Sequence, residues 1–422
     1  MNNLIKNIYL NGHIILLSLI FYGLSIGILL KEINLIFLPS VDLHILHIYR
    51  FLIVIICIFA FFTLEKKFSK NGFILILINF LFLVSTIFTE ELRFSIDGME
   101  YLRNYNTSPN SRDIFFSSKT KVLIINFFNI ILPIIFLLFL RVKKFDLNKY
   151  KNISLKICDI NLIILLSLLI FKYFYINFFS QEKNIEWHLI NIHSLLYILN
   201  IHFLLIVDQY FLKKEISKTN IIKIFGIFVC FSITKSYVFV LICITSYIIY
   251  FVVFSYQLKK LIYLISSICL IIIVYVYYEY LSYNQTFKFV IYEPGTILNS
   301  IFIRIKNIEY YLYYSENLNL IFGNNIFSEQ AATYPHNFFV DLIFCTGIFG
   351  TLLFLFLIYL LLKNIKKINL ENIFFFIIFF QSLFFSIFSG FLFTNMVFNI
   401  SLATLFCLIG EKEEKMSKNS RG

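Results

Sequence analysis

The chain has 422 residues, of which 59% are hydrophobic, 19% aromatic and 14% charged, and its mean hydropathy is +0.83. Apolar runs of about 20 residues, the length that a bilayer core requires, recur along the whole sequence, so the composition excludes a soluble globular protein. The net charge of +12 lies mainly in the loops between the runs, and without a soluble basic domain we expect no nucleic acid as a partner.

The apolar runs predict an all-α fold, a polytopic membrane protein with about 12 transmembrane helices. Because the runs are continuous and bounded by Lys-rich loops, they exclude a membrane β-barrel, whose strands alternate apolar and polar residues. The expected spans cover, in chain order, residues 8–30, 44–64, 73–89, 122–140, 160–179, 188–212, 219–234, 237–256, 261–281, 337–362, 373–388 and 391–410. Two regions, 219–256 and 373–410, also fit a single span with a re-entrant piece.

Basic residues predict on which side of the membrane each loop lies. If the N-terminus is cytoplasmic and every span is real, most of the 36 Lys and Arg residues fall on one side. The positive-inside rule assigns that side to the cytoplasm. We therefore expect a single integral membrane domain over residues 1–422, with both termini cytoplasmic and a cytoplasmic tail at 411–422. The first span lacks a cleavage site, which predicts a retained signal anchor.

Two loops on the outer side are long enough to carry function, near residues 90–121 and 282–335, whereas the remaining loops are short. The first mixes acidic and basic residues that can pair with each other. The second contains a segment at 301–314 with helical periodicity and tyrosines on one side, which predicts an amphipathic helix lying on the outer leaflet. We expect these tyrosines to belong to the aromatic belt at the membrane surface.

The second outer loop ends at the stretch YPHN, directly before a long apolar run. Proline fits the first turn of a helix and a short polar side chain binds free backbone N–H groups, so Pro335 and Asn337 predict that His336 stands at or just before a helix N-terminus. The partial positive charge there disfavours imidazolium and leaves the ring able to accept a proton. On a continuous helix Gly347 and Gly350 share the side of His336, and small residues let another helix approach closely.

Taken alone, His336 fits an interfacial or capping histidine better than a catalyst. Two cations on its side favour the catalytic interpretation: Lys235, at the tight outer turn in SITKSYVF, and Arg304, in the loop that leads to His336. Lys235 also fits a lysine that extends to the outer interface. One base and two cations suit transfer from a lipid pyrophosphate, because charge grows on the leaving pyrophosphate while the attacking sugar hydroxyl loses its proton.

No metal and no cofactor are expected. The sequence offers no outer Asp-x-Asp motif, and lysine and arginine can neutralise phosphate oxygens without a metal. The seven cysteines lie almost entirely in the predicted spans, without metal-ligand spacing and without a pair in an outer loop, so neither a zinc site nor a disulfide framework is indicated.

Several motifs within residues 225–410 resemble a known family. The stretches NSIFIRIKNIEYYLYY, NLNLIFGNN and HNFFVDLIFCTGIFGTLLFLFLIYLLLK are similar to the O-antigen polymerase and O-antigen ligase superfamily of bacterial inner-membrane proteins. The family's His-x10-Gly pattern falls at His336 and Gly347, and its arginine falls at Arg304. Its outer-facing Ser-Arg segment resembles FSITKSYVFVLICI, in which Lys235 stands where arginine is usual.

The chain departs from the family pattern at three places. Lys235 keeps the positive charge but lacks the planar fork with which arginine binds a phosphate through two hydrogen bonds. The stretch GNN stands where Gly-x-Gly is common, and Tyr310 or Tyr311 stands where a tryptophan is often found.

The resemblance implies a metal-independent glycosyltransferase of the GT-C type at the periplasmic face of the inner membrane, in lipopolysaccharide biosynthesis. It implies transfer of the growing glycan from undecaprenyl pyrophosphate to a hydroxyl of the next lipid-linked repeat unit. In this scheme His336 is the general base, while Arg304 and Lys235 hold the donor pyrophosphate. The implied partners are the lipid-linked oligosaccharide and membrane lipid, and a chain-length regulator protein is compatible with the scheme.

Three functions stay open: an O-antigen polymerase, a ligase that attaches glycan to the lipid A core, and a lipid-linked oligosaccharide flippase or other transporter. The Ile, Phe, Asn and Lys-rich composition favours the polymerase. A transporter predicts inverted repeats and charges along a central path, whereas Lys172, Asp208, Glu279 and Asp341 are scattered without symmetry. Asp341 lies about 140° around the helix from His336, so we expect a separate structural contact for it.

Overall fold

The structure is a computed structural model. It describes residues 70–97, 119–139, 147–179, 192–213, 217–233, 237–254, 308–327, 337–364, 373–388 and 391–419, together with position 368 and a few positions before residue 60.

The described part of the chain is helical, as the sequence predicts. Its main elements are α4 (Lys70–Phe88), α7 (Lys119–Asn126), a π-helical turn η3 (Phe127–Ile131), α8 (Leu132–Phe139), α9 (Leu147–Phe179), α10 (Ile192–Lys213), α11 (Lys218–Ile233), α12 (Tyr237–Phe254), α15 (Phe338–Lys363), α16 (Ile373–Phe388), a 3-10 turn η6 (Leu392–Thr394) and α17 (Met396–Asn419). Each of the two ambiguous regions forms two helices, α11 with α12 and α16 with α17. The expected spans at 8–30, 44–64 and 261–281 lie largely outside the described residues.

Two of the described helices are long and apolar enough to cross a membrane, judged by length and composition: Leu147–Ile170 within α9, and Phe338–Lys363, which is α15. Shorter apolar helices of 10 to 17 residues form most of the remaining bundle. These features agree with a membrane protein, while the number of spans and their sidedness stay predictions.

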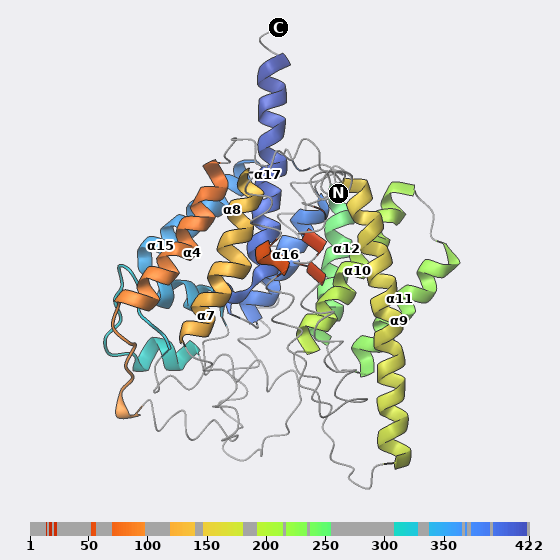
Figure 1. Ribbon diagram of the computed structural model, residues 1–422, viewed down its shortest axis with the longest axis horizontal. Coiled ribbons are helices and arrows are strands. Elements are labelled where there is room, and N and C mark those ends of the chain that lie inside the picture. The colour runs from red at the N-terminus through yellow and green to blue at the C-terminus, as the bar shows by residue number, and fades with distance from the viewer. Residues whose placement is uncertain are drawn as a thin grey trace.

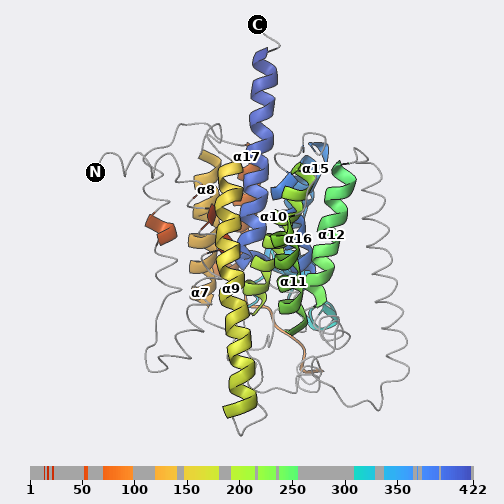
Figure 2. The same cartoon turned by 90° about the vertical axis from the view of Figure 1, so that its right-hand side faces the viewer.

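The helices form one bundle with α16 and α17 in its middle (Figure 1). On one flank α4, α8 and α15 lie together, and on the other α9 to α12 pack around α10, with α12 and α10 against α16. We call the end of the bundle at which α4 ends the lower end, and the end at which α9 begins the upper end. The last turns of α17 extend past the upper end and those of α9 past the lower end (Figures 1 and 2). The expected tail at 411–422 therefore continues α17 as far as Asn419.

The helix α15 is not the continuous span that the sequence predicts. Gly347 has φ 65° and ψ −165°, so the helical path breaks there. The rings of Phe338 and Phe354 contact each other with centroids 4.7 Å apart, whereas sixteen residues on a straight helix cover about 24 Å. The two halves of α15 therefore fold toward each other in a sharp V, with the bend at Gly347.

The segment that fills the bend of α15 is a loop, and the expectation that Gly347 admits a neighbouring helix is wrong. A Cβ on Gly347 would lie 2.3 Å from the carbonyl oxygen of Ile321. The backbone N–H of Ile348, left without a helical partner by the break, donates to Leu320 O at 2.7 Å. At Gly350 the space that was expected for a helix is occupied by the side chain of Thr346 from α15 itself.

The same loop contributes a glycine of its own to the contact. Gly323, the first residue of GNN, has φ 78°, and a Cβ on it would lie 2.5 Å from the carbonyl carbon of Cys345. Its neighbour Asn324 donates its backbone N–H to Phe344 O at 2.7 Å, and its side-chain amide donates to Glu90 O and to Asn317 O. The GNN motif thus fastens the second predicted outer loop to α15 and to the first.

Described parts of the two predicted outer loops, residues 90–97 and 308–327, pair with each other at the lower end. Leu92 N donates to Asn325 O at 2.8 Å, and Ser95 N donates to Tyr314 O at 2.9 Å. Two isolated β-bridges accompany these bonds. The described parts of both loops therefore lie together at one end of the bundle, and we call the paired segments the lower cover.

The tyrosines of the lower cover do not form the predicted aromatic belt throughout. Residues 308–314 are helical, while positions 301–307 lie outside the described residues. Tyr310 and Tyr311 are fully buried, and Tyr310 stacks on Phe94 with ring centroids 4.2 Å apart. Their burial raises the pKa of both hydroxyls, which stay protonated at neutral pH. Tyr313 is 79% exposed, so it retains the exposure that a place in the aromatic belt requires.

Candidate functional site at recessed helix ends

The three residues to which chemistry was assigned, His336, Arg304 and Lys235, lie outside the described residues, so the structure does not test their convergence. Their neighbour Asn337 is described. It is the N-cap of α15, where its side-chain oxygen accepts from Phe339 N at 3.0 Å and from Val340 N at 3.3 Å. The prediction of a helix start at this point is confirmed, and His336 directly precedes that cap in the sequence.

The start of α15 lies inside the bundle and not at its lower surface. Phe338 contacts Phe354, which stands seven residues, or about 10 Å, along α15 from the bend. Phe338 also lies 5.7 Å from the ring of Phe398 near the start of α17. The V shape of α15 thus carries its first turn back from the lower cover into the protein.

The connection between α16 and α17 is recessed as well. Its η6 turn places Phe393 against Phe82 of α4, with stacked rings 4.3 Å apart, although Phe82 stands six residues, or about 9 Å, before the end of α4. Phe327 of the lower cover packs against Phe82 and Phe391. Backbone outside regular helices is tolerated at membrane depth where protein buries it or where it lines a polar cavity.

An acidic side chain joins these two recessed ends. Asp341, in the first turn of α15 and fully buried, accepts from Leu392 N at 3.3 Å through Oδ2. This is the separate structural contact that the sequence predicts for it. The other carboxylate oxygen, Oδ1, is buried and has no hydrogen-bond partner among the described residues.

A cluster of buried asparagine amides surrounds the η6 turn. Asn79 of α4 donates to Asn399 Oδ1 at 3.0 Å, and Asn126 of α7 donates to Asn79 Oδ1 at 2.9 Å and to Phe393 O at 2.8 Å. Asn395 accepts from Phe398 N and so caps the start of α17. Sequence reasoning considered only ionisable residues inside the apolar runs, although the asparagines within residues 73–89, 122–140 and 391–410 were an available signal.

The recessed site offers acceptor atoms without donors. Besides Asp341 Oδ1, the side-chain oxygen of Asn126 is buried and lacks a hydrogen-bond partner among the described residues. Asn126 and Asp341 bind neighbouring residues of η6, Phe393 and Leu392. Buried acceptors without donors are costly unless a ligand or water binds them, and hydroxyl groups are suitable donors.

The electrostatics of the site combine two helix N-termini and one carboxyl group. The first turns of α15 and α17 meet at Phe338 and Phe398, and each helix start carries a partial positive charge of about half an elementary charge. Such ends attract anionic groups. These groups complement the chemistry of a molecule that carries both phosphate and hydroxyl groups.

Two further ionic groups lie between helices on the other flank. Asp159 of α9 accepts from Lys223 of α11 at 2.8 Å and lies 2.9 Å from Nε2 of the fully buried His202 of α10. Closer to the upper end, Lys151 of α9 pairs with Asp208 of α10 at 2.8 Å. Of these five, the sequence singled out Asp208 as an ionisable residue inside a span.

A third partner completes the pair at the upper end. Tyr250 of α12 donates its hydroxyl to Asp208 Oδ1 at 2.5 Å, so the carboxylate binds groups from two other helices. Within the described residues no group of three His, Cys, Asp or Glu side chains is arranged to hold a metal ion. These ionic groups therefore connect helices through charge and hydrogen bonds.

Replacing Asn337 with alanine is expected to weaken the start of α15. The change removes a side-chain oxygen that accepts two backbone N–H groups, and the loss of an N-cap costs about 1 kcal/mol. Asn337→Asp keeps the acceptor and is expected to keep the stability. Thermal unfolding of the purified variants in one detergent measures both effects, and equal losses in the two variants would contradict the capping role.

In comparisons with known proteins, no protein family, no curated protein and no solved structure matches this chain.

Proposed function

We propose that the chain is a polytopic inner-membrane glycosyltransferase, an O-antigen polymerase that transfers a glycan from undecaprenyl pyrophosphate to the next lipid-linked repeat unit. The observation that supports this most is the recessed polar site. Two helix N-termini, a carboxyl group and amide acceptors without donors lie inside an apolar bundle, beneath a cover built from two loops. A substrate with a diphosphate and sugar hydroxyls offers the groups that such a site requires.

In the proposed reaction His336 acts as the general base at the start of α15. The acceptor hydroxyl oxygen attacks the anomeric carbon, its proton passes to the imidazole, and the bond from that carbon to the pyrophosphate oxygen breaks. Arg304 and Lys235 hold the leaving pyrophosphate, whose negative charge grows as the bond breaks. The positive end of α15 disfavours imidazolium, which keeps His336 ready to accept the proton.

The proposed membrane orientation puts the lower end of the bundle in the periplasm and the upper end toward the cytoplasm. It is supported by the basic residues at the upper end, where α10 ends at Lys213 and α15 ends at Lys363. Lys149 and Lys156 of α9 lie near that end as well. The recessed site then lies toward the side on which lipid-linked repeat units are polymerised in the family that the sequence resembles.

The experiment that tests the proposal is a gel of surface polysaccharide from a strain whose chain carries His336→Ala. Removal of a general base lowers the rate by about 10²–10⁴-fold, so we expect long chains to disappear while single repeat units stay attached to the core. Arg304→Lys, which keeps the charge, is expected to reduce long chains less than Arg304→Ala does. Normal long chains in the His336→Ala strain, with the protein present in the membrane, would overturn the proposal.

The same gel separates the alternatives. An O-antigen ligase predicts long glycan that accumulates on its lipid carrier. A flippase or other transporter predicts that His336→Ala leaves polymerisation intact, and the specific observation in favour of transport is the set of ionic groups between helices, Asp159 with His202 and Lys223, and Lys151 with Asp208. Ionisable residues inside spans commonly mark transport pathways.

A further inference from the structure

One exposed face of α9 changes character along its length. Lys149, Asn152 and Lys156 are exposed in its first turns, followed on the same face by Ile160, Ile163 and Ile170. At 100° per residue these positions fall within an arc of about 80°. The three isoleucines are 60%, 65% and 53% exposed. The face is therefore cationic and polar at the upper end and mainly apolar below it, where Ser167 is also exposed.

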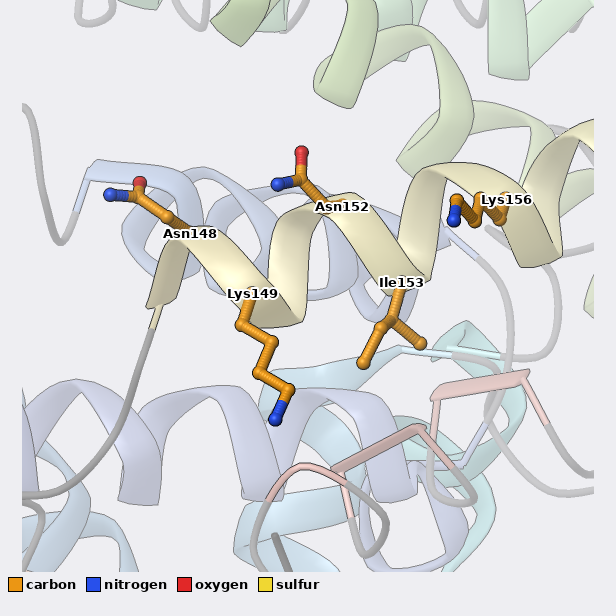
Figure 3. A pocket seen from close by; sticks show the side chains of 5 residues that line it. All are labelled: Asn148, Lys149, Asn152, Ile153 and Lys156. Atoms are coloured by element: carbon orange, nitrogen blue, oxygen red, sulfur yellow. The ribbon is translucent and has the colours of Figure 1, made fainter.

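A shallow pocket of about 380 Å³ lies over the polar part of this face. It is lined by Asn148, Lys149, Asn152, Ile153 and Lys156. Figure 3 shows Asn148 and Asn152 projecting on one side of α9 and Lys149 and Ile153 on the other, with Lys156 further along the helix. The volume is in the range that a small ligand group requires.

The order of these groups along α9 matches that of a phospholipid in a bilayer leaflet. The ammonium groups of Lys149 and Lys156 and the amides of Asn148 and Asn152 lie at the depth expected for the phosphate and glycerol of a lipid. The exposed isoleucines begin one turn further along α9, at the depth expected for the acyl chains. Basic pockets between or beside transmembrane helices on the cytoplasmic side suit anionic headgroups. A soluble phosphate would use the lysines but would leave the apolar row without a ligand.

We infer that the upper-end face of α9, from Lys149 to Ile163, is a binding site for an anionic phospholipid of the cytoplasmic leaflet. The headgroup phosphate binds at Lys149 and Lys156 with Asn152 between them, and one acyl chain lies along Ile160 and Ile163. The site goes beyond the proposed glycosyl transfer and depends solely on the proposed membrane-spanning arrangement. It lies at the opposite end of the bundle from the recessed site.

The test measures lipid retention by the purified full-length protein. Native mass spectrometry in detergent compares phosphatidylglycerol with phosphatidylcholine of the same acyl chains, and we expect the protein to retain phosphatidylglycerol preferentially. A lysine near an anionic surface contributes about fivefold, so K149Q together with K156Q is expected to weaken phosphatidylglycerol binding by about 30-fold. Replacement of both residues by arginine is expected to preserve it.

Lys218→Gln provides the matched control. Lys218 is exposed at the start of α11, above the exposed Ile221, Ile222 and Phe225, so it is an exposed lysine over an apolar row on a different helix. Its loss is expected to change binding by no more than about fivefold. Equal retention of the two lipids, an unchanged preference in the double variant, or full competition by soluble glycerol phosphate would each overturn the lipid site.

Discussion

Replacing Gly347 with alanine is expected to destabilise the protein by about 3 kcal/mol or more. The φ and ψ angles of Gly347, 65° and −165°, fall in a region that is essentially restricted to glycine, and a residue with a Cβ there costs about 1–3 kcal/mol. The added Cβ would also lie 2.3 Å from Ile321 O and 2.7 Å from Phe322 N. Since both are backbone atoms, the overlap is relieved only if the loop moves out of the bend.

The loss is expected to reach beyond the substituted residue. When the loop moves, Ile348 N and Phe349 N lose their acceptors, Leu320 O and Ile321 O. These two hydrogen bonds replace the helical bonds that are lost at the break in α15. An N–H that is left without an acceptor away from water costs about 1–3 kcal/mol. Gly323→Ala is expected to disrupt the same contact from the loop, because its Cβ would lie 2.5 Å from Cys345 C and Thr346 N of α15.

Gly226→Ala is the control, because a Cβ at Gly226 would contact only side chains. Gly226 lies within α11, and a Cβ on it would meet first the side chain of Leu166 at 3.3 Å, which can shift. Alanine is also the better helix former, so this variant is expected to differ from the parent by less than about 1 kcal/mol. The measurement is the apparent unfolding temperature of each purified variant in the same detergent. Similar unfolding temperatures for Gly347→Ala and Gly226→Ala would contradict the close contact between the loop and the bend of α15.

The sequence predicted the helices of the described part and the placement of its two long loops on one side, whereas their pairing with each other was not predicted. It did so because apolar runs of this length and the positions of lysines report directly on burial and on sidedness. The N-cap at Asn337 was predictable for a similar reason, since capping depends on adjacent residues. These features are local in the chain or follow from composition.

The bend at Gly347 and the recessed site depend on contacts between distant segments, and therefore escaped prediction. A glycine inside an apolar run fits a helix, a close helix crossing or a break, and the loop at Leu320 and Ile321 decides between them. Likewise, Asn79, Asn126 and Asn399 are separated by long stretches of chain and become a cluster only when α4, α7 and α17 pack. Uncharged amides within apolar runs give little signal singly.

The ionic groups between α9, α10 and α11 also escaped prediction, because they too depend on contacts between distant segments. Asp159 and Lys223 are partly buried, with side chains 29% and 25% exposed, and in the sequence each stands near a predicted span boundary, where charge is ordinary. Their pairing brings charge into contact with the fully buried His202. Variants that remove one or both charges of a pair distinguish a role in the stability of the bundle from a role in transport.

Removing one partner of the Lys151–Asp208 pair is expected to destabilise the bundle by about 3–5 kcal/mol. Both side chains are nearly buried, at 10% and 3% exposed, so Asp208→Leu leaves the ammonium of Lys151 without its counter-ion, close to the ring of Phe374. It also removes the acceptor of the Tyr250 hydroxyl. Unfolding in detergent, compared with the parent, measures the loss.

The double variant Lys151→Met with Asp208→Leu is expected to recover most of that loss, because apolar side chains of similar volume often replace a buried ion pair without penalty. It also separates the proposed functions. The pair lies at the upper end, away from the recessed site, so a polymerase is expected to keep making long chains with both charges removed. A stable double variant that has lost long chains while retaining His336 would instead favour a function that requires charge inside the bundle, and would contradict the assignment of catalysis to the lower end.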